Sequence, residues 1–374
     1  MADARIPAAA ALAAALLLPG VAATAAPGAK LPPGPPFDPA AKIAHRISLT
    51  FDTAPARDIL ARLAGGAGAP AALRRLRAST AVRAACRSES VSTEDFFGRL
   101  VAAASGTPDP LLASYKGRTA YFLAVLDAMD GEGPTLDATV VARIAQLLPE
   151  SPAVDARLVV LPFLGVAGYG EVTPVREEGA LYFVAELPRL TGDVLAAPEP
   201  REAFLKILRA VESEGWRVLF NESFRKPPAW PATAGDGADF DAFLALTVSE
   251  GPATVYLFAD EFFPLDPFLG EPIERAFRRW NRTAEMLLDP LAKEKARREI
   301  FAGATKGDFW ARSPAIVGAQ MTDLLLRQAG REAFLRALAA GPRAVAVLYA
   351  NTVKGSKHPD FSKVVRKALE EKKP

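Results

Sequence analysis

The segment from Phe204 to Phe220 places the tightest constraint on the fold of this chain. Glu214 lies inside its apolar stripe, and a carboxylate in apolar surroundings is costly unless it is paired. Acids in such settings cluster at functional sites, so Glu214 is the first candidate functional residue. The apolar residues are spaced three and four apart, which predicts a helix with one buried face: Phe204, Ile207, Leu208, Val211, Val218 and Leu219.

The residues around this acid resemble a metal-binding motif. SEGWR at 213–217 resembles HExxH with both histidines replaced; in that motif two histidines at i and i+4 on one helical face bind zinc and the Glu is the general base. Ser213 and Arg217 stand at the two histidine positions. Downstream, EGPA at 250–253 resembles the EGxA pattern of glutamate-type zincins, in which the acid, here Glu250, is the third zinc ligand.

On these motifs the chain is similar to a family of secreted bacterial peptidases regarded as zinc-dependent. The resemblance runs from about Ile47 to Tyr349 and includes ISLTFDTAPARDIL near its start and IVGAQMTDLLLRQAGREAFLRAL near its end. It implies an α+β fold that is mostly helical: a zincin-like peptidase domain with a small β-sheet beside the motif helix. It also implies zinc as the family cofactor and an edge strand that binds the substrate main chain.

The chain departs from this family at the metal ligands. Zinc sites usually contain at least one His or Cys, and the two histidines here, His45 and His358, lie far from the motif in sequence. The guanidinium of Arg217 stays protonated and cannot bind a metal. At ~4 Å and an effective dielectric constant of ~20, it would repel a divalent ion by about 8 kcal/mol. We therefore expect no metal and no cofactor.

The site prediction follows from that departure. Glu214 is a vestigial catalytic base, and Ser213, Arg217 and Glu250 occupy former metal-site positions. We expect Arg217 to supply positive charge in place of the metal by pairing with Glu214 or Glu250. The simpler interpretation is that Glu214 is a partly buried acid in a salt bridge and Glu250 a helix-terminal acid.

Three functions remain open at this point. The first is an exported metallopeptidase-like pseudoenzyme, catalytically inactive, that binds a peptide or protein through the vestigial cleft. The second is an active peptidase or other hydrolase with Glu214 as general base and a metal held by Glu214, Glu222 and Glu250; carboxylates alone suit calcium, magnesium or manganese. The third is a structural envelope protein.

Charge and cysteine content bound the alternatives further. The 374 residues carry a net charge of +2, which gives no electrostatic reason to expect nucleic acid as a partner. The single cysteine, Cys86, excludes an intramolecular disulfide. Its neighbours Arg83 and Arg87 favour a reactive thiolate, whereas the absence of a histidine partner favours a buried, idle thiol.

The N-terminus predicts export. Residues 1–26 have a basic start, an apolar run and an A-x-A pattern, which is typical of a signal peptide cleaved near Ala25 or Ala26 and predicts a periplasmic or secreted protein. An uncleaved anchor is the alternative. No other run is long and apolar enough for an integral membrane segment after signal cleavage. Residues 27–44 form a Pro-rich linker.

The remainder is interpreted as a single peptidase-like domain over 45–353. Its part from 45 to 150 is helical, and its part from 155 to 353 holds the sheet and the motif helices. Strands are predicted at 46–51, 155–163 and 179–184, and a helix pair broken at Gly330 follows. Residues 354–374 are predicted to be a frayed basic tail.

Overall fold

The structure, a computed structural model, describes most of the chain from His45 to Glu371. It leaves out residues 66–68, 108, 110–111, 113–114, 116, 167–171, 191–197, 231–238, 259–269 and 307–308. The described residues lie in the unit that spans Pro33–Pro374. The predicted signal peptide and Pro-rich linker lie outside the described residues.

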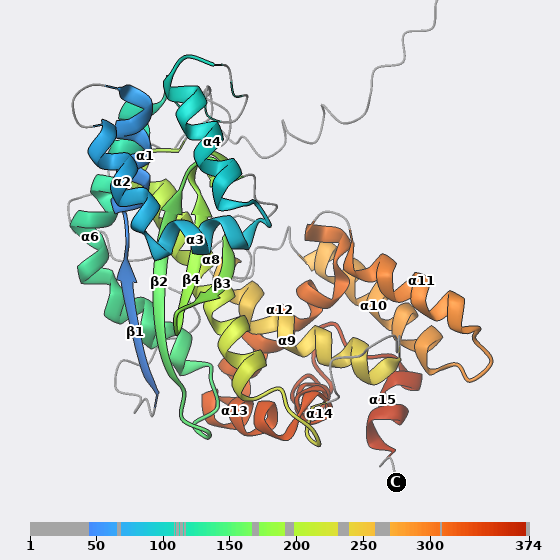
Figure 1. Cartoon of the computed structure of the whole chain (residues 1–374). Coiled ribbons are helices and arrows are strands. Elements are labelled where there is room, and N and C mark those ends of the chain that lie inside the picture. The colour runs from blue at the N-terminus through green and yellow to red at the C-terminus, as the bar shows by residue number, and fades with distance from the viewer. Residues whose placement is uncertain are drawn as a thin grey trace, which may run out of the picture. The chain divides into compact units, whose positions relative to one another are not determined.

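The described strands form one sheet in the order β1-β2-β4-β3 (Figure 1). β1 (Arg46–Phe51), β2 (Asp155–Phe163) and β4 (Ala180–Glu186) are parallel, and β3 (Thr173–Glu177) pairs antiparallel with β4. β4 is buried along its whole length, as expected of an inner strand rich in branched and aromatic residues. The predictions of the first two strands are confirmed, and the third is confirmed with its bounds shifted.

Helices from the first half of the chain pack on this sheet (Figure 1). α3 contacts β3, β4 and β2, while α6 contacts β1 and α8. The N-terminal part is helical around the strands, as predicted. The helices of this part of the chain, including those that pack on other helices, are α1 (Ala54–Ala64), α2 (Ala69–Ala78), α3 (Thr80–Ser88), α4 (Thr93–Ala104), α6 (Thr119–Gln146), the short α7 (Leu187–Leu190) and α8 (Pro200–Ser223).

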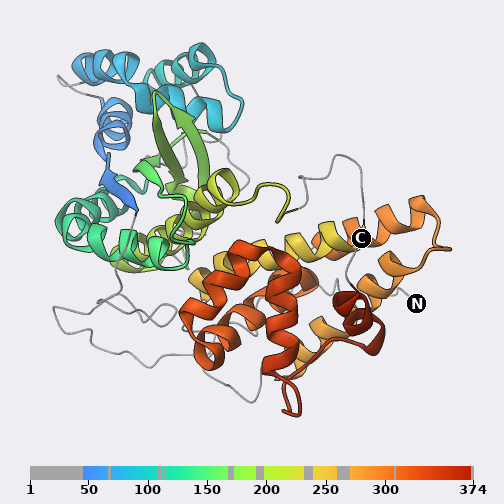
Figure 2. The same cartoon turned by 90° about the horizontal axis from the view of Figure 1, so that it is seen from below.

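The second half of the described chain is helical, and α9 is its centre (Figure 2). α9 packs against α8, α12 and α14. The break at Gly330 is confirmed: a π-helical turn at Leu325–Ala329 ends there, and a new helix begins. The elements are α9 (Phe240–Phe258), α10 (Gly270–Leu288), α11 (Glu294–Thr305), α12 (Ser313–Leu324), α13 (Arg331–Ala340), α14 (Pro342–Thr352) and α15 (Lys363–Glu370).

These elements confirm a mostly helical α+β fold with a small mixed sheet. None of the described helices combines the length and apolar character that crossing a bilayer requires.

The prediction of a frayed tail after residue 353 is wrong. α15 packs against α10 and α14, and its Val365 and Leu369 are buried. Ser362 caps the helix by accepting a hydrogen bond from the backbone N–H of Val365. The apolar positions four residues apart form a buried stripe, so the basic residues lie on the remaining face rather than preventing folding.

A hydrogen bond to His45 at the start of the sheet depends on pH. Its Nδ1 accepts a hydrogen bond from the backbone N–H of Val154 at 3.1 Å, beside the first pair of β1 and β2. Burial lowers the pKa of His45 below its usual 6.5, and nearby Arg331 lowers it further, against opposing contributions that include the charge of Glu150. Protonation of Nδ1 also removes the acceptor of the hydrogen bond from Val154.

We therefore expect the stability of the native protein to fall below about pH 6.5, because the unfolded chain then binds the proton more readily than the folded one. A His45→Gln variant retains an acceptor and does not titrate. Urea denaturation from pH 5 to pH 8 should show a drop in unfolding free energy in the native protein that the variant lacks. Equal pH slopes in both proteins would contradict this assignment.

Candidate functional site

The sequence SEGWR lies in the middle of α8, which has different neighbours on its two sides. Gly215 faces α6 and the sheet: a Cβ there would lie 3.0 Å from Cδ1 of Ile144 and 3.5 Å from Phe183. The indole N–H of Trp216 donates to the carbonyl of Leu147 at 2.9 Å. The middle of the motif is therefore explained by packing, and the polar residues on either side of it face elsewhere.

Arg217 joins the two motif helices. One of its terminal nitrogens donates to Oε1 of Glu214, and the other donates to Oε2 of Glu250 on α9 at 3.0 Å. The side chains of Arg217, Glu214 and Glu250 are 26%, 23% and 26% exposed. The prediction that Arg217 pairs with these acids is confirmed for both. We call these three residues the Arg217 cluster.

Arg217 carries a fixed positive charge in this cluster. Burial by itself lowers the pKa of Arg217, but the charges and hydrogen bonds of Glu250 and Glu214 outweigh it, and the net pKa is raised. A guanidinium that stays protonated offers a metal ion no lone pair and repels it. The donor set at the former ligand positions, a guanidinium, a hydroxyl and one carboxylate, does not fit zinc.

Glu250 is positioned by a close crossing of α9 and α12. A Cβ on the next residue, Gly251, would lie 2.5 Å from the carbonyl oxygen of Gly318 and from Oγ1 of Thr322. A Cβ on Gly318 would lie 2.0 Å from the carbonyl oxygen of Thr247. Gly251 of the EGPA sequence and Gly318 of the IVGAQM segment thus face each other where α9 and α12 cross.

Glu222 does not join the cluster. It pairs with Arg176 of β3, whose Nε donates to Glu222 Oε1 at 2.8 Å. Eight residues along a helix place it about 12 Å from Glu214. Over the described part of the chain, no three His, Cys, Asp or Glu side chains are grouped so that they could hold a metal. The structure does not assemble the carboxylate site of Glu214, Glu222 and Glu250.

The most deeply buried acid of α8 is Glu212, which the sequence interpretation missed. Glu212 is 2% exposed and lies 3.5 Å from a terminal nitrogen of Arg143 on α6. The phenol of Tyr256 on α9 donates to the carbonyl of Arg143. Glu214 is only partly exposed and pairs with Arg217, so the interpretation of it as a partly buried acid in a salt bridge is confirmed. The interpretation of Glu250 as a helix-terminal acid is wrong, because it lies inside α9.

A row of polar atoms without partners follows one face of α8. Ser213 is fully buried, and its Oγ has no hydrogen-bond partner among the described residues. Three further buried atoms also have no hydrogen-bond partner among the described residues: Nε of Arg217, Oδ1 of Asn221 and Nε of Arg225. The first three are spaced four residues apart, so they share a face of the helix. Asn221 and Arg225 were not predicted, although a four-residue spacing that continues from 213 and 217 was visible.

Glu250 also lines a pocket of about 170 Å³, which we call the Glu250 pocket. The side chain of Arg312, which precedes α12, is exposed and forms no hydrogen bond or ion pair within the described residues. Most of the pocket surface is apolar, and its polar groups come from Glu250, Arg312 and Thr305. Its lining consists of Leu246, Glu250, Thr305, Arg312, Pro314 and Ala315.

The cysteine is not reactive. Cys86 is 1% exposed, and burial raises the pKa of its thiol to about 11. At neutral pH it is a thiol and not the thiolate that attacks electrophiles. Of the two interpretations of Cys86, the buried thiol is confirmed, and the reactive thiolate is not supported.

No protein-family model, curated protein or solved structure matches this chain. The assignment to a peptidase family therefore still depends on the motif resemblance.

Proposed function

We propose that this chain is an exported metallopeptidase-like pseudoenzyme that binds a peptide or protein and has lost zinc chemistry. The observation that carries the proposal is the position of Arg217. It bonds to the acid at the general-base position and to the acid at the third-ligand position. A fixed cation thus stands where the two motifs imply that the metal would stand.

The same contacts argue against peptide hydrolysis. A zincin needs an ion that activates a water molecule and a carboxylate that is free to take its proton. Here one oxygen of Glu214 already accepts a hydrogen bond from Arg217, and a guanidinium has no vacant coordination position for water. Both contacts therefore make metal-assisted hydrolysis at this position unfavourable.

The position of β3 supports peptide binding. β3 is the last strand in the described sheet order and pairs there with β4 alone. An edge strand presents backbone N–H and C=O groups to which an extended peptide can add as a further strand. The ion pair between Arg176 of β3 and Glu222 of α8 brings this strand beside the motif helix. The Glu250 pocket offers space for a side chain.

The purified native protein is expected to contain far less than one zinc per chain by elemental mass spectrometry and to leave a mixed peptide library uncleaved. The double variant Ser213→His, Arg217→His replaces the cation with two imidazoles that, with Glu250, complete a three-ligand zinc site. It should gain chelator-reversible zinc, because the repelling cation is removed and two imidazoles four residues apart share one helical face.

Ser213→His alone is the matched control. It adds a ligand but keeps the repelling cation, so it should bind no zinc. Stoichiometric zinc in the native protein would overturn the proposal. A folded double variant without zinc affinity would overturn the zincin geometry. Hydrolysis by the native protein that Glu214→Gln abolishes would favour the hydrolase, and absence of peptide binding would favour the structural envelope protein.

A further inference from the structure

Arg225 is a half-buried cation that has no anionic partner among the described residues. Its Nε is buried and, within the same residues, has no hydrogen-bond partner, and no described carboxylate forms an ion pair with it. Burial lowers its pKa, which the charge of Glu250 only partly offsets. A cation after the last turn of a helix is favoured by the helix dipole, but that interaction does not require burial. A half-buried charge is costly to leave unpaired, so an anionic ligand that paired with Arg225 would be stabilised.

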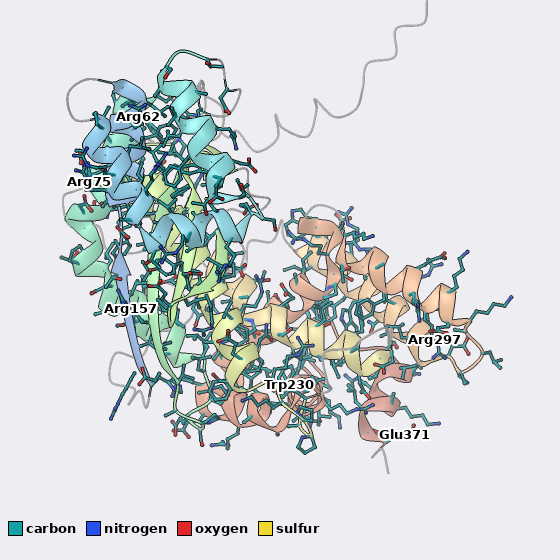
Figure 3. The ribbon with its side chains drawn as sticks, viewed as in Figure 1. Arg62, Arg75, Arg157, Trp230, Arg297 and Glu371 are labelled. Carbon is teal, nitrogen blue, oxygen red and sulfur yellow. The ribbon has the colours of Figure 1, made fainter. Side chains whose placement is uncertain are left out.

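The position of Arg225 is fixed by the turn that follows α8. Its backbone N–H donates to the carbonyl of Phe220, and Trp230 closes the turn by donating from its backbone N–H to the carbonyl of Lys226. Trp230, labelled in Figure 3, is 1% exposed; its ring packs at 5.0 Å from Phe220, and its indole N–H donates to Leu338. A buried tryptophan therefore anchors the segment that carries Arg225.

The charges around Glu250 leave an excess of positive charge. Arg217 bonds to Glu250, Arg225 lies close enough to feel its charge, and Arg312 lines the Glu250 pocket beside it. Among the described residues, two acids oppose these three arginines, Glu250 and Glu214, and Arg217 engages both. No described carboxylate pairs with Arg225 or Arg312.

We propose that the site selects acidic peptides, with carboxylates of the ligand pairing with Arg225 and Arg312 and a small apolar side chain entering the Glu250 pocket. The inference rests on the proposed peptide-binding function and names its substrate class. Arginine suits this role because its planar fork of donors matches the geometry of a carboxylate. The apolar part of the pocket wall, Leu246, Pro314 and Ala315, suits an aliphatic group.

The test uses two fluorescent hexapeptides that differ only in two glutamates replaced by two glutamines. Binding to the full chain is measured by fluorescence anisotropy at low and high salt. The acidic peptide should bind about tenfold more tightly than the neutral one at low salt, and this advantage should shrink as salt screens the charges. Arg225→Gln and Arg312→Gln should each weaken the acidic peptide about tenfold and leave the neutral one unchanged.

Two variants serve as controls. Arg225→Lys keeps the charge and should keep most of the acidic preference. Arg74→Gln removes the same charge from an exposed arginine on α2, which contacts neither α9 nor α12, and should have no effect. Equal binding of both peptides, unchanged by either glutamine variant, would overturn the inference and leave the peptide-binding function standing. Failure of both peptides to bind would overturn the peptide-binding function and the inference with it.

Discussion

Gly318→Ala is expected to lower the free energy of unfolding by about 3 kcal/mol or more. The added methyl group would lie 2.0 Å from the carbonyl oxygen of Thr247 and 3.0 Å from the backbone of Gly251. Overpacking costs about 1–3 kcal/mol when side chains can adjust. Here the opposing atoms belong to the backbone of α9, so the two helices must separate. Urea denaturation followed by circular dichroism measures the loss.

Gly303→Ala is the matched control for this prediction. Gly303 lies in α11, and no atom lies within 4 Å of the position that its Cβ would take. The same substitution should stabilise the protein there by about 1 kcal/mol, since alanine favours helix. If both variants shift the denaturation midpoint alike, the close crossing of α9 and α12 is not a determinant of stability.

Arg143→Leu is expected to cost about 3–5 kcal/mol of unfolding free energy. The side chains of Arg143 and Glu212 are 8% and 2% exposed, so the substitution leaves a buried carboxylate without this cation. The loss should be measured at pH 7 by the same denaturation experiment. The expected loss of unfolding free energy exceeds the contribution of an exposed ion pair, which is at most about 1 kcal/mol.

The double variant Arg143→Leu, Glu212→Leu separates the cost of removing the cation beside Glu212 from the loss of packing. Replacing both members of a buried pair by apolar residues is often close to neutral, so the double variant should recover most of the loss. A double variant as unstable as the sum of the two single variants would show that packing around Arg143, and not the charge on Glu212, sets the penalty.

The contact between 213–217 and 249–253 could be predicted from sequence because the two motifs carry an implied geometry. The strands at 46–51 and 155–163 were predicted from their β-branched and apolar residues. β3 was missed because Pro174 and Arg176 do not favour an inner strand; such residues are tolerated at an edge. Whether a strand is an edge depends on tertiary structure.

The more deeply buried acid of α8, Glu212, was missed for a related reason. Periodicity predicts which residues share a helix face, but it does not say how many faces are covered. Glu212 is buried against α6, whereas Glu214 remains partly exposed, and the order of the two depends on neighbours distant in sequence. The unpartnered atoms of Asn221 and Arg225 could likewise be recognised only once their surroundings were known.

The link between α8 and α9 through Arg217 is made entirely by the polypeptide. A bound ion dissociates, competes with other ions and depends on supply, whereas an arginine side chain has a fixed stoichiometry of one per chain. The two helices are therefore joined as soon as they fold, in metal-poor or metal-rich surroundings alike, and no chelator can separate them.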